Sequence, residues 1–157
     1  MKLTKSDIEQ GYGILKEVID HYIETHNIAF ISSEIAPSTF EGMKAYYYDF
    51  GKFLVFSGGD HGYLGQEYNI KFRAVHDFMH LKYKLSFKFE DEKVLSGKTE
   101  ADFGLIACYT LNKTASECHL LMAIIDAEIK GQIEYYEKNK EYVKDQREFI
   151  NDYLKAA

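Results

Sequence analysis

The chain contains only one proline, Pro37, in 157 residues. Proline lacks the backbone N–H group and breaks helices, so long stretches without it favour long helices. Apolar residues recur at helical spacing in the first such stretch, until about Thr25: Ile8, Leu15, Val18, Ile19, Tyr22 and Ile23. We expect this helix to begin near Ser6, because Ser6 and Glu9 fit a capping box in which each side chain satisfies a free backbone donor.

After this helix the pattern becomes extended. The segment NIAFIS, residues 27–32, predicts a short strand, and AYYYDFGKFLVFSGG, residues 45–59, predicts a hairpin that turns near residues 49–52. The next segment, SGGDHGYLG at 57–65, is rich in glycine and predicts a loop. Its Asp60 and His61 could contact a metal or a substrate, although turn formation is the simpler explanation.

The rest of the chain is expected to be mostly helical, with residues 86–98 irregular or partly extended. Thr114 and Glu117 fit a second capping box, and Ser96 or Thr99 fits the start of the helix before it. The expected helices are about 66–85, 96 or 99 to 111, and 114–154, the last bent near Gly131 or Asn139. We therefore predict one α+β domain over residues 1–157, mostly helical, with a small antiparallel sheet after the first helix.

Charge and apolar patterning exclude several functions. Lys and Arg total 19 against 25 Asp and Glu, a formal net charge of −6, so we expect no nucleic-acid binding, which depends on neutralising phosphates. The longest apolar run, LLMAIIDA at 120–127, is too short to cross a bilayer, and the N-terminal segment does not resemble a signal peptide. Cytoplasmic location is therefore expected. Cys108 and Cys118 have apolar neighbours and are expected to be buried free thiols.

The segment RAVHDFMHLK, residues 73–82, holds the strongest candidate site. His76 and His80 are four residues apart, so on a helix both imidazoles lie on one face and can bind one cation. Neutral imidazole is a common zinc ligand, and a catalytic zinc needs a third protein ligand and an open position for water. Because Asp77 follows His76, the segment has the form H-[acid]-x-x-H, close to the H-E-x-x-H signature. The alternative is a solvated pair on an ordinary amphipathic helix.

This segment resembles the thermolysin-like metallopeptidases, the gluzincins. There a Glu ligand follows the second histidine after a gap like that from His80 to Glu100, in an Asn-Glu-Ala-x-x-Asp context; this chain reads Thr-Glu-Ala-Asp at 99–102. The resemblance covers only about residues 72–104. It implies zinc ligands at His76, His80 and Glu100, with Asp77 as the catalytic general base.

Two features leave alternatives open. Asp77 is one methylene shorter than the Glu of the family, so it could orient an imidazole instead of acting as the base. The acidic run at Glu90, Asp91 and Glu92 could also supply the third ligand by folding back toward the histidines, although a solvated loop is the simpler reading.

A second, looser resemblance involves FRAVHDFMHLK, which is similar to a Trp-His-Asp-x-x-His-Leu segment of small phage-encoded proteins. Val75 stands where those proteins have Trp. This resemblance supports Arg73, His76, Asp77 and His80 as one unit and implies a phage origin, with the host cytoplasm as the location.

The sequence therefore predicts a zinc-dependent hydrolase of the metallopeptidase type, acting on a protein or peptide. The alternative is a phage accessory or inhibitor protein that binds a host factor, with the histidines as a structural metal site or no site. A metal-dependent phosphohydrolase is a weaker third possibility, because it would need more clustered aspartates. A homodimer through the C-terminal helix is also possible.

Overall fold

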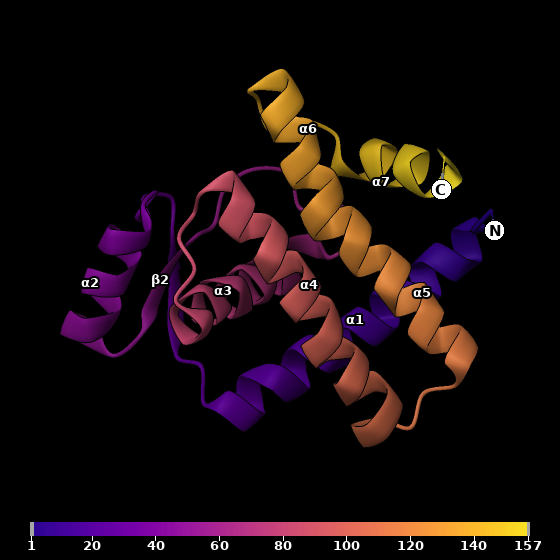
Figure 1. Ribbon diagram of the computed structural model, residues 1–157, viewed down its shortest axis with the longest axis horizontal. Coiled ribbons are helices and arrows are strands. Elements are labelled where there is room, and N and C mark those ends of the chain that lie inside the picture. Colours follow the sequence, from indigo (N-terminus) through magenta and orange to yellow (C-terminus); the bar gives the residue numbers. More distant parts are fainter. Residues whose placement is uncertain (1, 157) are drawn as a thin grey trace.

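The computed structural model describes residues 2–156 and consists mostly of helices around one small sheet (Figure 1). The elements are α1 (Lys5–His26), β1 (Phe30–Ser33), α2 (Phe40–Phe50), β2 (Phe53–Phe56), α3 (Gly65–Tyr83), α4 (Phe89–Leu105), η1 (Ile106–Thr110), α5 (Ala115–Asp126), η2 (Ala127–Gly131), α6 (Gln132–Asn139) and α7 (Gln146–Ala156). The α+β class is confirmed in this broad sense.

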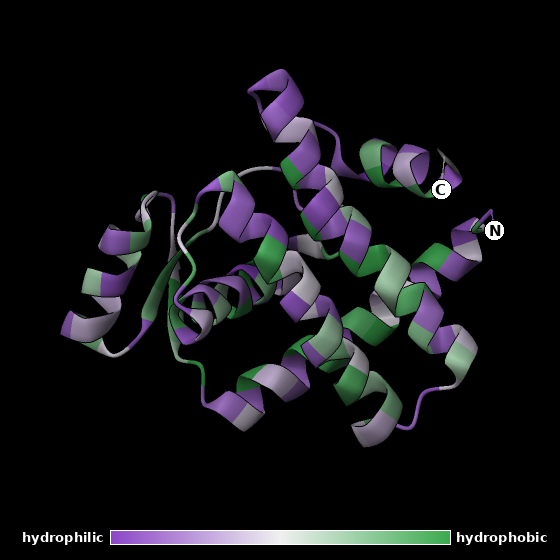
Figure 2. Ribbon diagram, in the orientation of Figure 1, coloured by the Kyte–Doolittle hydropathy of each residue, from purple (hydrophilic) through white to green (hydrophobic). Residues whose placement is uncertain are grey.

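The core forms where α1 packs against α5, and Figure 2 shows hydrophobic residues gathered where α1, α4 and α5 come together. The predicted first helix is confirmed, but Thr4 and Asp7 form its capping box, not Ser6 and Glu9. Gly11 permits the close approach of α5: a Cβ atom there would lie 2.7 Å from Cγ1 of Ile124. Close packing of this kind excludes even one additional methyl group.

The sheet is parallel, so the predicted antiparallel hairpin is wrong. β1 pairs with β2 in register, with Phe30 opposite Phe53 and Ser33 opposite Phe56. The tyrosine-rich segment expected to be the first hairpin strand is part of helix α2, which is the crossover that a parallel pair requires. Thr39 caps the start of α2 by accepting a hydrogen bond from the Gly42 amide.

Helix α4 begins earlier than expected, because residues 89–98 are helical, not irregular. Thr99 does not cap a helix: it is buried in the middle of α4, and its hydroxyl donates to the Leu95 carbonyl at 2.9 Å. Ser86 precedes α4, and its backbone amide donates to the Asp91 carboxylate at 2.9 Å. Asp91 thus ties the start of α4 to the preceding turn.

The C-terminal helical region is divided in two. The capping box of Thr114 and Glu117 is confirmed at the start of α5. Figure 1 shows α5, η2 and α6 as one rod, and the chain leaves it after Asn139, one of the two positions where a bend was expected. Within the π-helix η2, buried Glu128 accepts hydrogen bonds from Tyr12 and, at 2.8 Å, from Gln132.

The two cysteines form a disulfide, so the expectation of free thiols is wrong. Cys108 is exposed on η1, and Cys118 is largely buried on α5. The bond therefore joins the two elements on either side of the loop at residues 111–114. Within residues 2–156, no helix is both long and apolar enough to cross a membrane.

The contact between α1 and α5 gives a matched pair of substitutions. We expect Gly11→Ala to lower the free energy of unfolding by about 1–3 kcal/mol, because its methyl group overlaps Ile124. Gly13→Ala, on the same helix, should raise it by about 0.5–1 kcal/mol, because a Cβ there meets no atom within 4 Å and alanine favours the helix. Urea unfolding of both variants measures the difference, and an equal gain in both would show that α5 does not pack closely on Gly11.

Candidate metal centre

Helix α3 carries both histidines of the site, and its C-terminal end fixes the ring of His80. The left-handed Lys84 (φ 55°) ends the helix, and the chain turns back so that Nδ1 of His80 lies 2.9 Å from the Leu85 carbonyl oxygen. A carbonyl only accepts, so Nδ1 donates, and Nε2 is the ring nitrogen left to bind a metal. The side chain of His80 is fully buried, and its Nε2 is therefore a preoriented donor atom for a metal.

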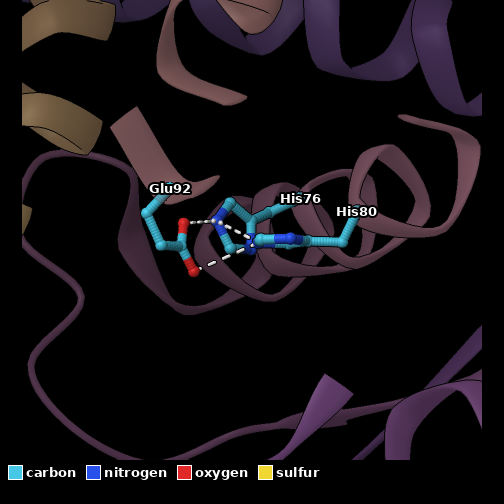
Figure 3. A group of neighbouring side chains, drawn as sticks. All are labelled: His76, His80 and Glu92. Carbon is cyan, nitrogen blue, oxygen red and sulfur yellow. Dashed lines mark hydrogen bonds and ion pairs between the residues drawn. The ribbon is translucent and has the colours of Figure 1, made fainter. Parts of the chain in front are cut away.

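The carboxylate of Glu92, in the first turn of α4, closes the group (Figure 3). Its Oε2 lies 3.0 Å from Nε2 of His76, and its Oε1 lies 3.1 Å from Nε2 of His80. The two Nε2 atoms are 3.2 Å apart. Two ligands bound to one tetrahedral zinc at about 2.0–2.1 Å lie about 3.3 Å apart, so these three side chains are spaced as ligands of one ion.

The two charges in this group stabilise each other. Burial lowers the pKa of His76, but the carboxylates of Glu92 and Asp77 more than reverse that effect and raise it to about 10. Burial raises the pKa of Glu92, yet the two imidazoles hold it far below its ordinary value. In the metal-free protein at neutral pH, His76 is therefore protonated and paired with an ionised Glu92, and a metal must displace this proton.

Asp77 contacts His76 from the other side of the ring. Its Oδ1 lies 3.7 Å from Nδ1 of His76, an ion-pair distance too long for a hydrogen bond. Because Nδ1 and Nε2 lie on opposite sides of an imidazole, this carboxylate lies away from the Nε2 atoms that face Glu92. Arg73 lies one turn earlier on α3 and donates to the carbonyls of Phe56 and Gly58, at 2.6 and 2.9 Å. The position of Asp77 fits the orientation of His76, the alternative role considered for it from the sequence.

The structure does not bring Glu100 to the histidines. Glu100 follows Glu92 by eight residues on α4, which corresponds to about 12 Å along the helix. Burial and the nearby carboxylate of Asp126 raise the pKa of Glu100, and Lys130 partly opposes them. The expected third ligand thus lies in another acidic group, and Glu92 occupies its place.

The other acids of the run have different environments. Glu90 is largely exposed, and Asp91 accepts hydrogen bonds from Ser86. The glycine-rich loop also has another role, since the Asp60 carboxylate accepts from the Gln146 amide at the start of α7. Glu92 could have been singled out from the sequence only with the start of α4 known, because that start places it in the first turn of a helix.

Comparisons of the chain with protein-family models, with curated proteins and with solved structures found no match. The gluzincin and phage resemblances therefore remain predictions from a local segment. The geometry of His76, His80 and Glu92 is the main indication of function.

The charge pairing makes the stability of the metal-free protein depend on pH. Folding raises the pKa of His76 from 6.5 to about 10. The contribution of its charge to the free energy of unfolding is therefore complete below pH 6.5 and is lost as the pH rises to about 10. We expect the free energy of unfolding to fall by about 1–3 kcal/mol over this window, less than the full shift implies because the side chain is 29% exposed. Urea unfolding with a chelator, compared with His76→Gln, measures this; equal slopes in both proteins would contradict it.

Proposed function

We propose that this protein binds a divalent transition-metal ion through His76, His80 and Glu92, and that zinc is this ion. The single observation that carries the proposal is the close spacing of the three side chains: the two Nε2 atoms lie 3.2 Å apart, and each lies 3.0–3.1 Å from one oxygen of the Glu92 carboxylate. Three side chains from two helices converge on one point. Nδ1 of His80 donates to the Leu85 carbonyl, a partner that metal-bound histidines usually have, and the Asp77 carboxylate lies 3.7 Å from Nδ1 of His76.

The donor set supports the choice of ion. Two imidazoles and one carboxylate are a known ligand set of catalytic zinc. Magnesium and calcium prefer sites made entirely of oxygen, and the two nitrogen donors disfavour them. The same two-histidine, one-carboxylate set with open positions also serves non-haem Fe(II), so iron is the competing ion in any binding experiment.

Three protein ligands leave a fourth position of a tetrahedral zinc for water. Partial exposure of His76 and Glu92, at 29% and 16%, supports solvent access to that position. Zinc lowers the pKa of such a water toward 7 and supplies hydroxide, so we propose a hydrolase of the amide-cleaving type. Asp77 would orient His76; the general-base role implied by the gluzincin pattern would require it to reach water on the opposite side of the ring.

A structural metal site in a binding protein is the second candidate, and the burial of His80 favours it. A ligand with no exposed surface belongs to the interior, where an ion can fasten α3 to α4. Structural zinc contributes directly to folding. The function would then depend on the surface of the protein, such as contact with a host factor, and not on the ion.

The choice between Glu92 and Glu100 gives the sharpest test of the site. We expect protein purified without a histidine tag and loaded with zinc to hold about one ion per chain. Glu92→Gln should lower the zinc affinity at least about tenfold, whereas Glu100→Gln, the same substitution two turns further along α4, should bind zinc like the unchanged protein.

Calorimetry of the same titration should also show proton release, because zinc displaces the proton of His76. Fe(II) added without oxygen serves as the competing ion. Loss of zinc in Glu100→Gln with full retention in Glu92→Gln would overturn this ligand assignment. His76→Ala should lose zinc. If this variant still folds, the site is functional; if it unfolds, the site is structural.

The hydrolase proposal makes a separate prediction, because hydrolysis needs an accessible zinc-bound water. We expect the zinc-loaded protein to hydrolyse p-nitrophenyl acetate faster than the metal-free protein. Asp77→Asn should keep the zinc and lose about ten- to a hundredfold in rate, the usual effect of removing a group that supports a metal ligand. Stoichiometric zinc without zinc-dependent hydrolysis would favour the structural alternative.

A further inference from the structure

A second candidate site is separate from the metal centre. It is a cleft of about 680 Å³ formed by α1, by α7 and by the loop that precedes α3. Figure 1 shows α7 beside the N-terminal half of α1, where this cleft lies. Its volume falls within the range of small-molecule sites, about 300–1,000 Å³. None of the three proposed metal ligands lines it, so binding in this cleft does not depend on the proposed function.

The cleft is positively charged in an acidic protein. Its lining includes one carboxylate, that of Glu9, and four cationic side chains: Lys5, Lys16, Arg147 and Lys155. The chain as a whole has a formal net charge of −6. A concave surface lined by one sign of charge raises the local concentration of ions of the opposite sign.

Two of these cations are not neutralised by carboxylates. Arg147 donates from Nε to the Gly62 carbonyl at 3.1 Å, and its guanidinium lies over the ring of Tyr63, 5.1 Å from the centroid. Nζ of Lys16 lies 5.3 Å from the ring centroid of Tyr68. Among residues 2–156, neither side chain has a carboxylate within ion-pair distance. Their charges therefore remain available to a ligand.

Two tyrosines in the wall of the cleft are held in place. Tyr12 is almost fully buried, its ring stacks on Tyr63 with centroids 5.0 Å apart, and its hydroxyl donates to Glu128. Tyr63 in turn donates to Oδ1 of Asn151 at 2.8 Å. Leu3 and Ile8 add aliphatic surface. Such a site does not need to reorganise on binding, which favours affinity.

From these features we propose that the cleft binds a small organic anion, with a phosphate or carboxylate group near Lys16 and Arg147 and an apolar body against the tyrosines. Lys and Arg side chains pair with oxyanions through charge-assisted hydrogen bonds. Aromatic and aliphatic walls bind the rest of such a molecule by excluding water.

Gly13 provides a way to close the cleft without disturbing the fold. It lies on α1 in the lining, and a Cβ there would meet no atom within 4 Å. Gly13→Glu places a carboxylate where the anion would bind, and repulsion at short range should weaken binding at least about tenfold. Gly97→Glu is the matched control, because Gly97 is an exposed glycine of α4 with equally open surroundings.

The test is an NMR titration with phenyl phosphate, benzoate and inorganic phosphate, each up to about 10 mM, a range that detects millimolar binding. We expect shifts confined to amides around Gly13, Tyr63 and Arg147, reduced by added salt and lost in Gly13→Glu but not in Gly97→Glu. Circular dichroism checks that both variants fold.

The two organic probes distinguish a phosphate from a carboxylate ligand. Binding of inorganic phosphate as strong as that of phenyl phosphate would overturn the apolar part of the proposal. Absence of binding by both organic probes, or binding that survives Gly13→Glu, would overturn the site itself.

Discussion

The carboxylate of Glu92 is only 16% exposed, and the protonated imidazole of His76 on α3 compensates its negative charge. Removing one partner from a buried ion pair is costly, because the remaining charge is left unpaired. This requirement holds the first turn of α4 against α3, and the buried Thr99 and Phe103 follow further along the same helix. A proton on His76 provides the compensation in the metal-free protein, and a divalent ion can provide it in the same place.

Local signals predicted much of the helical structure. The periodicity of α1 and the capping box of α5 depend on residues three or four positions apart, and both elements were found. The sheet was predicted wrongly because strand pairing is decided by distant residues. Tyr46, Tyr47 and Tyr48 favour strands on their own, but the cap at Thr39 and the left-handed Gly51 enclose them in a helix.

In the candidate site, too, local spacing predicted one part and contacts between distant residues decided the rest. Helical spacing alone was enough to place His76 and His80 together, since one element carries both. The third side chain comes from another helix, so its identity depends on where α4 begins and how it crosses α3. Glu92 and Glu100 are both acids on α4, and no local pattern distinguishes them; only the start at Phe89 places Glu92 beside the histidines. The Glu-Ala pair of the gluzincin pattern favoured Glu100, which lies two turns further along.

The π-helix η2 restricts where residues can be inserted into or deleted from this chain. A π-turn holds one residue more than the α-turn it replaces, and here that turn carries Glu128 into the core beside Tyr12. Deleting a residue there would rotate all of α6 by about 100° relative to α5 and move Glu128 out of register with its partners. Insertions and deletions should therefore be tolerated between α6 and α7, at residues 141–144, and selected against within η2.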